Sequence, residues 1–232
     1  MGHDSAVSIV FVVGTGTDVG KTHVTSALVG AARESMRVSA WKPVTSGGLD
    51  DVARLTVAAG EPIGAPLHAL GAPVSPHLAA RHEGIAIDVR TLVGAAIELA
   101  KHVDVLFVES AGGLYSPLSD NDTNADVARA LGGEAQLLLV APDRLGVLHD
   151  VGAVVRAARA DGLLFAAVAL SAPEHADAST GTNAAEIQKL GLALDVVTFP
   201  RAPSLDDEAT RRAATACLSA FGVLSRPAAA RR

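Results

Sequence analysis

Two kinds of apolar pattern alternate along the chain from one end to the other. Short runs rich in Val, Leu, Ile and Ala, bounded by glycine, proline or charged residues, predict buried strands. Longer segments in which apolar residues recur every three or four positions predict amphipathic helices. The expected strands are 8–13, 37–41, 103–108, 136–141, 163–170 and 194–199. The expected helices are 23–35, 50–59, 75–81, 88–101, 123–131, 147–160, 182–190 and 205–221, with a loop over 60–74.

This alternation specifies right-handed βαβ units, and therefore an α/β fold with a mostly parallel sheet and helices on both faces. Of the 232 residues, 49% are apolar and only 3% are aromatic. The core must therefore consist of Ala, Val, Leu and Ile, which suits a sheet that is buried on both faces. We expect a single domain over residues 1–225 and a frayed tail over 226–232.

A glycine-rich turn with the sequence GTGTDVGKT separates the first strand from the first helix. In that setting, backbone N–H groups can surround a phosphate, and the start of the helix adds partial positive charge. Lys21 can neutralise terminal phosphate oxygens, and the hydroxyl of Thr22 can bind Mg²⁺. The motif predicts a phosphate-loop NTPase-type fold and a nucleotide site formed by Gly14, Thr15, Gly16, Thr17, Asp18, Val19, Gly20, Lys21 and Thr22.

The loop departs from the common G-x-x-x-x-G-K-[ST] spacing, because Thr15 stands where that pattern has glycine. Counted from Gly14, the loop is one residue longer. A chance Gly-Lys-Thr in an unrelated turn is the alternative, which the flanking strand and helix disfavour.

Polar residues also follow two further predicted strands. The strand 37–41 ends at KPVTSGG, where proline and glycines should stop regular structure, so that Lys42 and Ser46 lie on the same rim as the phosphate loop. The strand 103–108 delivers Glu109, followed by small residues including Gly112. A carboxylate in that place matches the acidic Mg²⁺ partner of phosphate-loop enzymes. From local sequence alone, Asp51 is expected to cap the helix 50–59.

Composition narrows the possible partners and the compartment. A net charge of −6 argues against nucleic acid as the main partner. The single cysteine, Cys217, has no internal disulfide partner and is expected as a small core residue. No signal peptide and no apolar run of membrane-spanning length are visible, so we expect a cytoplasmic protein without a membrane partner.

Four motifs at these intervals resemble the dethiobiotin synthetase family: GTGTDVGKT at 14–22, KPVTSG at 42–47, SPH at 75–77 and VESAGGLYSPL at 108–118. The resemblance covers residues 10–146. It implies a homodimer that uses ATP and Mg²⁺ to close a cyclic urea across the two amines of 7,8-diaminononanoate with CO₂. In that family the reaction passes through a carbamate and a carbamic–phosphoric anhydride.

The resemblance also implies roles for individual residues. It surrounds the carbamate and γ-phosphate with Thr17, Asp18, Lys21, Lys42 and Ser46, of which the first four are the candidate catalytic residues. It assigns Mg²⁺ to Thr22, Asp51 and Glu109. It assigns further nucleotide contacts to Gly112 and Pro200. It assigns the carboxylate of the substrate to a helix start of the second subunit, here Gly146, Val147, Leu148 and His149.

The chain departs from the family at several of these positions. His149 and Asp150 replace the family's Asn and His, and Asp150 would repel a carboxylate unless it points away. Leu170 replaces the Asn that reads adenine, so we expect weak discrimination between bases. Asn183 is a possible substitute contact, although a helix cap is the expected role.

Two alternatives stay open at this point. One is another phosphate-loop ligase that activates a carboxylate or carbamate for a different amine. The other is a nucleotide-switched scaffold ATPase, which shares the fold, but such proteins carry an additional lysine early in the loop that this chain lacks.

Overall fold

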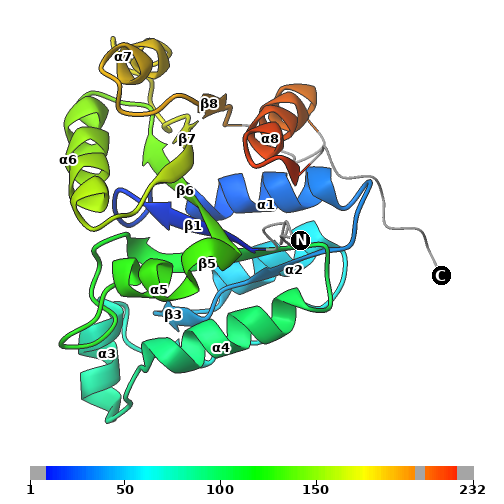
Figure 1. Cartoon of the computed structure of the whole chain (residues 1–232), viewed down its shortest axis with the longest axis vertical. Coiled ribbons are helices and arrows are strands. Elements are labelled where there is room, and N and C mark those ends of the chain that lie inside the picture. The colour runs from blue at the N-terminus through cyan, green and yellow to red at the C-terminus, as the bar shows by residue number, and fades with distance from the viewer. Residues whose placement is uncertain (1–8, 202–206, 224–232) are drawn as a thin grey trace, which may run out of the picture.

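A six-stranded parallel sheet forms the centre of the molecule (Figure 1). The computed structural model describes residues 9–201 and 207–223; the predicted tail 226–232 and the predicted start of the last helix at 205 lie outside them. The strands follow the order β2-β5-β1-β6-β7-β8. Their bounds are β1 (Ile9–Gly14), β2 (Val38–Trp41), β5 (Val105–Gly113), β6 (Ala135–Pro142), β7 (Phe165–Ser171) and β8 (Val196–Phe199). The predicted fold class is confirmed.

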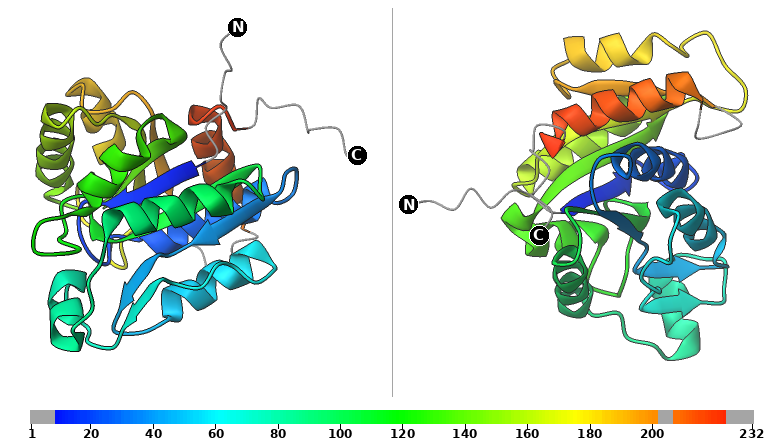
Figure 2. Two further views of the ribbon diagram at one scale, coloured as in Figure 1. Left: turned by 60° about the horizontal axis from the view of Figure 1, so that its bottom comes forward. Right: turned by 90° about the vertical axis from the view of Figure 1, so that its right-hand side faces the viewer.

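Helices cover both faces of the sheet (Figure 2). Side chains of a strand alternate between its two faces, so Val10 and Val12 pack on one side while Phe11 and Val13 pack on the other. The first side carries α1 (Lys21–Ala32), α2 (Asp50–Ala59) and α8 (Glu208–Ala220). The second carries α4 (Val89–Ala100), α5 (Asn124–Leu131), α6 (Val147–Ala160) and α7 (Asn183–Lys189), and α3 (Pro76–Glu83) also contributes to this core. A short 3₁₀ turn, η1 (Gly132–Glu134), precedes β6.

The segment after β2 differs from the prediction, which had no regular structure after Lys42 and a loop over 60–74. Instead β3 (Val44–Ser46) and β4 (His68–Leu70) pair as a small parallel sheet. Each strand has only three residues. A strand of three residues is too short to show an alternation of apolar and polar residues, and its pairing partner is distant in the chain. The pairing holds Ser46 beside Leu70.

Strand β5 is longer than predicted. It continues through Glu109 to Gly113, because Glu109 pairs with Val12 and Gly113 pairs with Gly14. Charged and glycine residues suggested an end at 108, but the neighbouring β1 supplies hydrogen bonds beyond that point. Glu109 therefore lies inside β5 rather than in a loop after it.

Two composition-based expectations can be compared with the fold. Cys217 lies on α8 with its side chain buried in the core, and it is a free thiol, as predicted. Across the described ranges, no helix combines the length and the apolar character that crossing a bilayer requires.

Candidate active site

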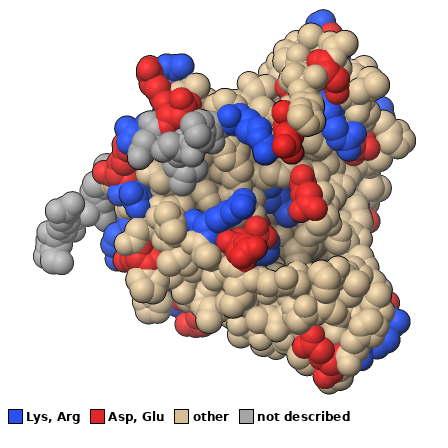
Figure 3. Space-filling model, turned by 180° about the vertical axis from the view of Figure 1, so that it is seen from behind, with Lys and Arg blue, Asp and Glu red and all other residues tan. Residues whose placement is uncertain are grey.

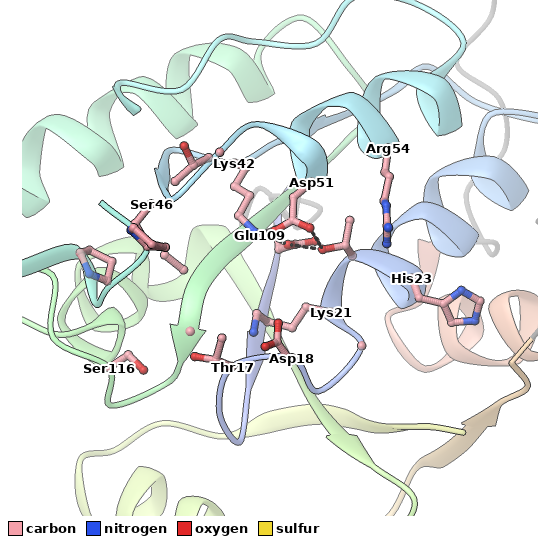
Figure 4. Close-up of a pocket in the computed structure, with 18 of the residues that line it drawn as sticks. Thr17, Asp18, Lys21, His23, Lys42, Ser46, Asp51, Arg54, Glu109 and Ser116 are labelled. Atoms are coloured by element: carbon pink, nitrogen blue, oxygen red, sulfur yellow. Dashed lines mark hydrogen bonds and ion pairs between the residues drawn. The ribbon is translucent and has the colours of Figure 1, made fainter. Parts of the chain in front are cut away.

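A cavity of about 880 Å³ lies where the phosphate loop meets the ends of β2, β5 and β7. The face of the molecule in Figure 3 is hollowed, and basic and acidic side chains gather around the hollow. Many of the predicted site residues line the cavity (Figure 4): Thr17, Asp18, Gly20, Lys21, Thr22, Lys42, Ser46, Asp51, Glu109 and Gly112.

The phosphate loop is held in place by its own backbone. The N–H of Thr15 donates to the carbonyl of Val140 on β6 at 2.9 Å. Asp18 and Gly20 both have positive φ angles, of 56° and 93°, which turns the chain into the start of α1. A Cβ on Gly14 would lie 2.7 Å from the carbonyl oxygen of Gly16, so the turn is too close for any other residue. The loop is thus preformed at the helix start.

Lys21 is the first residue of α1 and is only 6% exposed. Its Nζ folds back and donates to the carbonyl of Gly16 at 2.9 Å. Burial lowers the pKa of Lys21 to about 8; Glu109 opposes this shift, and the nearby charge of Lys42 adds to it. The ammonium is therefore poorly compensated by the protein, and an anion in the loop would stabilise it.

Lys42 joins the two carboxylates of the cavity. Its Nζ donates to Glu109 Oε1 at 2.8 Å and to Asp51 Oδ2. Burial alone would lower the pKa of Lys42, but the two carboxylates outweigh it and raise that pKa. Burial also acts to raise the pKa of Asp51, yet Lys42 and Thr22 hold it below its usual range. Lys42 and Asp51 are therefore charged at neutral pH.

Thr22 connects the phosphate loop to the same carboxylates. Its Oγ1 lies 2.8 Å from Asp51 Oδ1 and 2.9 Å from Glu109 Oε1. The expectation that Asp51 caps its helix is wrong: α2 has Leu49 at its N-cap position and no capping side chain. The carboxylate of Asp51 instead turns into the cavity (Figure 4).

The oxygen donors of Thr22, Asp51 and Glu109 fit Mg²⁺. Mg²⁺ prefers hard oxygen ligands and commonly binds one or two carboxylates together with waters and substrate phosphates. The buried Oε2 of Glu109 has no hydrogen-bond partner, so an acceptor is left over for a cation. In the part of the chain that the structure describes, no group of three or more His, Cys, Asp or Glu could hold a metal by itself. Waters and nucleotide phosphates would complete the site.

Small residues shape the end of the cavity around Thr17, Ser46 and Ser116 (Figure 4). Gly112 has a φ of 77°, and a Cβ there would lie 2.5 Å from the Oγ of Ser116. That Oγ accepts from the N–H of Gly113 at 2.8 Å. The backbone after Glu109 can consequently pass close to the phosphate loop, as the small residues of the motif predicted.

The residues at the start of α6 do not line the cavity of the same chain. Their positions are Gly146, Val147, Leu148 and His149. The side chain of Val147 is fully buried in the core, and its N–H donates to the carbonyl of Arg144 at 3.1 Å. Asp150, which was expected to repel a carboxylate, lies 3.7 Å from a guanidinium nitrogen of Arg144. Any role of this helix start in the site requires a second copy of the chain.

The end of the cavity near β7 and β8 offers few free groups. The carbonyl of Pro200, a predicted nucleotide contact, lies 2.8 Å from Nε2 of His23 and accepts from it when that nitrogen is protonated. Leu170 is fully buried in the core, while Ser171 beside it lines the cavity. Asn183 is no helix cap, contrary to expectation: its amide donates to Asp143 Oδ1 at 2.7 Å.

Sequence reasoning missed several side chains that line the cavity: His23, Arg54, Ser171 and Arg201. Ser171 and Arg201 lie at the carboxyl ends of two parallel strands. A polar residue in such a place is the signal that predicted the functional residues after the earlier strands. Arg54 comes three residues after Asp51 on one helix, a spacing that puts both on the same face. That signal was available once Asp51 was assigned to the cavity.

Comparison with known proteins decides the family. Residues 8–209 match the model of an AAA domain family, AAA_26. The ATP-dependent dethiobiotin synthetase BioD of Rhodopirellula baltica is 42% identical over 205 residues, which cover 78% of this chain and 80% of the relative. That of Anaeromyxobacter dehalogenans is 38% identical over 84% of this chain and 91% of the relative. The chain belongs to the dethiobiotin synthetase family.

Solved structures agree on the fold of this dethiobiotin synthetase family member. The cell division ATPase MinD of Pyrococcus furiosus has a TM-score of 0.57 at 18% identity, covering 94% of this chain and 99% of that chain. The signal recognition particle receptor FtsY of Elizabethkingia anophelis has a TM-score of 0.56 at 17% identity, covering 94% of this chain and 66% of that chain. At such identities the likeness shows the phosphate-loop NTPase fold alone.

Gly20 provides a test of the loop geometry. Its φ of 93° disfavours any side chain, and a Cβ would lie 2.3 Å from the Oγ of Ser171. We expect Gly20→Ala to weaken ADP binding by about tenfold or more and to lower the free energy of unfolding by about 1–2 kcal/mol. Calorimetric titration and denaturant unfolding measure the two effects.

The matched control is Gly162→Ala. Gly162 has a φ of 75°, but nothing lies within 4 Å of the added Cβ, and it does not line the cavity. This variant should share the backbone cost and keep its affinity for ADP. Equal loss of affinity in both variants would show that general destabilisation, not the geometry of the loop at Gly20, lowers the affinity for ADP.

Proposed function

We propose that the protein is an ATP-dependent dethiobiotin synthase that acts as a homodimer. It would close a cyclic urea from 7,8-diaminononanoate and CO₂ and release ADP and phosphate. One observation carries the proposal: in a chain of this family, Lys21, Lys42 and the oxygen donors around Thr22 converge in one cavity beside a preformed phosphate loop.

The reaction needs positioning and charge neutralisation more than a covalent catalyst. An amine adds to CO₂ to give a carbamate, a carbamate oxygen takes the γ-phosphoryl group, and the second amine displaces phosphate. Phosphoryl transfer of this kind depends on in-line geometry and on cations around the transferred group. Mg²⁺ held by Thr22, Asp51 and Glu109 would neutralise charge on the phosphates. Lys21 would contact their terminal oxygens from the loop side.

Lys42 would act as a fixed cation on the opposite side of the transferred group. Its pKa is raised by Asp51 and Glu109, so it keeps its proton and cannot serve as a general base. The reaction needs no general base at Lys42, because a neutral amine attacks CO₂ directly. A buried, fully charged ammonium stabilises developing negative charge more strongly than one in water.

The diamine would lie beyond the phosphates. Pro73, Val74 and Pro76 line that part of the cavity next to Ser46, and they give an apolar wall for an alkyl chain. The carboxylate of the substrate would reach the α6 start of the second subunit. There the pairing of Arg144 with Asp150 supports the proposal, because it offsets the negative charge that would otherwise oppose a carboxylate.

Product formation is the direct test. We expect ADP release to require both 7,8-diaminononanoate and bicarbonate, and labelled bicarbonate to appear in a cyclic urea. Departures from the family at His149 and Asp150 keep a second candidate in view, a phosphate-loop ligase for another amine. ADP release with a different amine, and none with 7,8-diaminononanoate, would favour that candidate.

Lys42 gives a test of the cation that separates catalysis from folding. Lys42→Met leaves the fully buried Glu109 without its cation, so the free energy of unfolding should fall by about 3–5 kcal/mol and turnover should be lost. The double variant Lys42→Met/Glu109→Gln removes the unpaired charge. It should regain much of the stability, measured by denaturant unfolding, while kcat stays low, because the glutamine also removes a proposed Mg²⁺ ligand. Recovery of kcat in the double variant would exclude Lys42 from the reaction.

Base preference gives another test. With a buried leucine at position 170, no amide is available there to read adenine. We expect kcat/KM values for ATP, CTP, GTP and UTP to lie within about a hundredfold of one another, since strong rejection requires buried hydrogen-bonding groups. A larger preference for ATP in parallel steady-state assays would show that another group reads the base.

A further inference from the structure

Arg54 is a charged side chain of the cavity to which the proposed reaction gives no role. It lies on α2, three residues after Asp51, and lines the same cavity. In Figure 4 its guanidinium points from α2 toward the start of α1, on the side of His23. Thr17, Ser46 and the other small residues lie at the opposite end of the view.

No described residue pairs with the side chain of Arg54. Within residues 9–201 and 207–223, Arg54 and Arg156 are the arginines whose side chains make neither a hydrogen bond nor an ion pair. Asp51, the nearest acidic residue in sequence on the same helix face, is already engaged by Lys42 and Thr22. A guanidinium carries five donors in a planar fork, and this one is left open toward the cavity.

The order of groups along the cavity indicates what Arg54 would meet. In a phosphate loop, the backbone N–H groups surround the α- and β-phosphates, and the loop lysine reaches toward the terminal phosphate. Lys21 and Thr22 therefore mark the terminal side and the metal. Arg54 lies on the His23 side of Asp51 (Figure 4), and His23 contacts the carbonyl of Pro200, the expected nucleotide contact, so a chain of phosphates would lead toward the ribose on this side.

We infer that Arg54 binds the ribose-proximal phosphates of the nucleotide from the α2 side, opposite the start of α1. This rests on the proposed function only in requiring a nucleotide in the cavity. The contact is charge-assisted and suits the geometry of a phosphate, so it adds affinity that is independent of the base. Such a contact complements a base end where Leu170 is buried and the carbonyl of Pro200 is engaged by His23.

The experiment is calorimetric binding of ADP, ATP and CDP to the full chain, without diamine, in the presence and in the absence of Mg²⁺. Arg54→Gln should weaken the binding of ADP, ATP and CDP by about tenfold, and the factor should be the same for all three nucleotides. Arg54→Lys should lose part of the affinity, because it keeps the charge without the planar fork. The melting temperature should change little, because Arg54 is exposed and its side chain makes no hydrogen bond or ion pair with any described residue.

Arg156→Gln is the matched control, because Arg156 is also exposed, unpaired within the described residues and placed on a helix, but outside the cavity. Its nucleotide affinities should equal those of the unsubstituted protein. An unchanged affinity in Arg54→Gln would overturn the inference. So would a loss confined to ATP, which would assign Arg54 to the terminal phosphate, or a loss confined to ADP and ATP, which would assign it to the base.

The outcome is separable from that of the proposed function. A protein that binds ADP through Arg54 but forms no cyclic urea would refute the synthase activity and leave this inference standing. If the Arg54→Gln variant forms the cyclic urea and binds nucleotides as well as the unsubstituted protein does, the synthase activity is supported and the inference about Arg54 is refuted.

Discussion

A carboxylate buried in the middle of a parallel sheet is the constraint on which the site depends. Glu109 lies inside β5 beside Val12 and is 0% exposed. An uncompensated charge in such a place costs several kcal/mol, so its partners are not optional. Lys42 arrives from the end of β2 and Thr22 from the start of α1, and each contacts the same oxygen of Glu109. The phosphate loop and the β2 end are thereby fixed relative to each other before any ligand binds.

Some charged and polar groups of the site have no partner within the described part of the chain, and their chemistry indicates which ligands they can bind. Glu109 keeps one buried oxygen without a partner, which is an acceptor available to a cation. Lys21 is buried with its pKa lowered, and Arg54 has no ion-pair partner among the described residues, so both are cations available to an anion. Proteins tolerate such inconsistencies mainly where a ligand resolves them. The proposed magnesium-bound nucleotide would supply both the cation and the anion.

Sequence reasoning found the parts of the site that local pattern determines. The phosphate loop, and the helices 50–59 and 147–160, followed from glycine spacing and strong periodicity. The position of Glu109 inside a strand did not, because pairing with β1 overrides the low strand propensity of the local sequence. Local sequence also predicted helix caps at Asp51 and Asn183, because it does not show their contacts with distant residues. A helix start reads the same whether its carboxylate or amide faces its own backbone or a distant neighbour.

Under the proposed function, binding energy would be divided unevenly along the nucleotide. At the proposed base end, one acceptor is already engaged by His23 and the position expected to read adenine is a buried leucine. At the proposed phosphate end, a preformed loop, two buried lysines and an open guanidinium line the cavity. Charge-assisted contacts to phosphate are about twice as strong as neutral ones, so affinity does not require base recognition. Which nucleotide binds would then depend on the nucleotide concentrations. Which reaction is catalysed would depend on the second substrate.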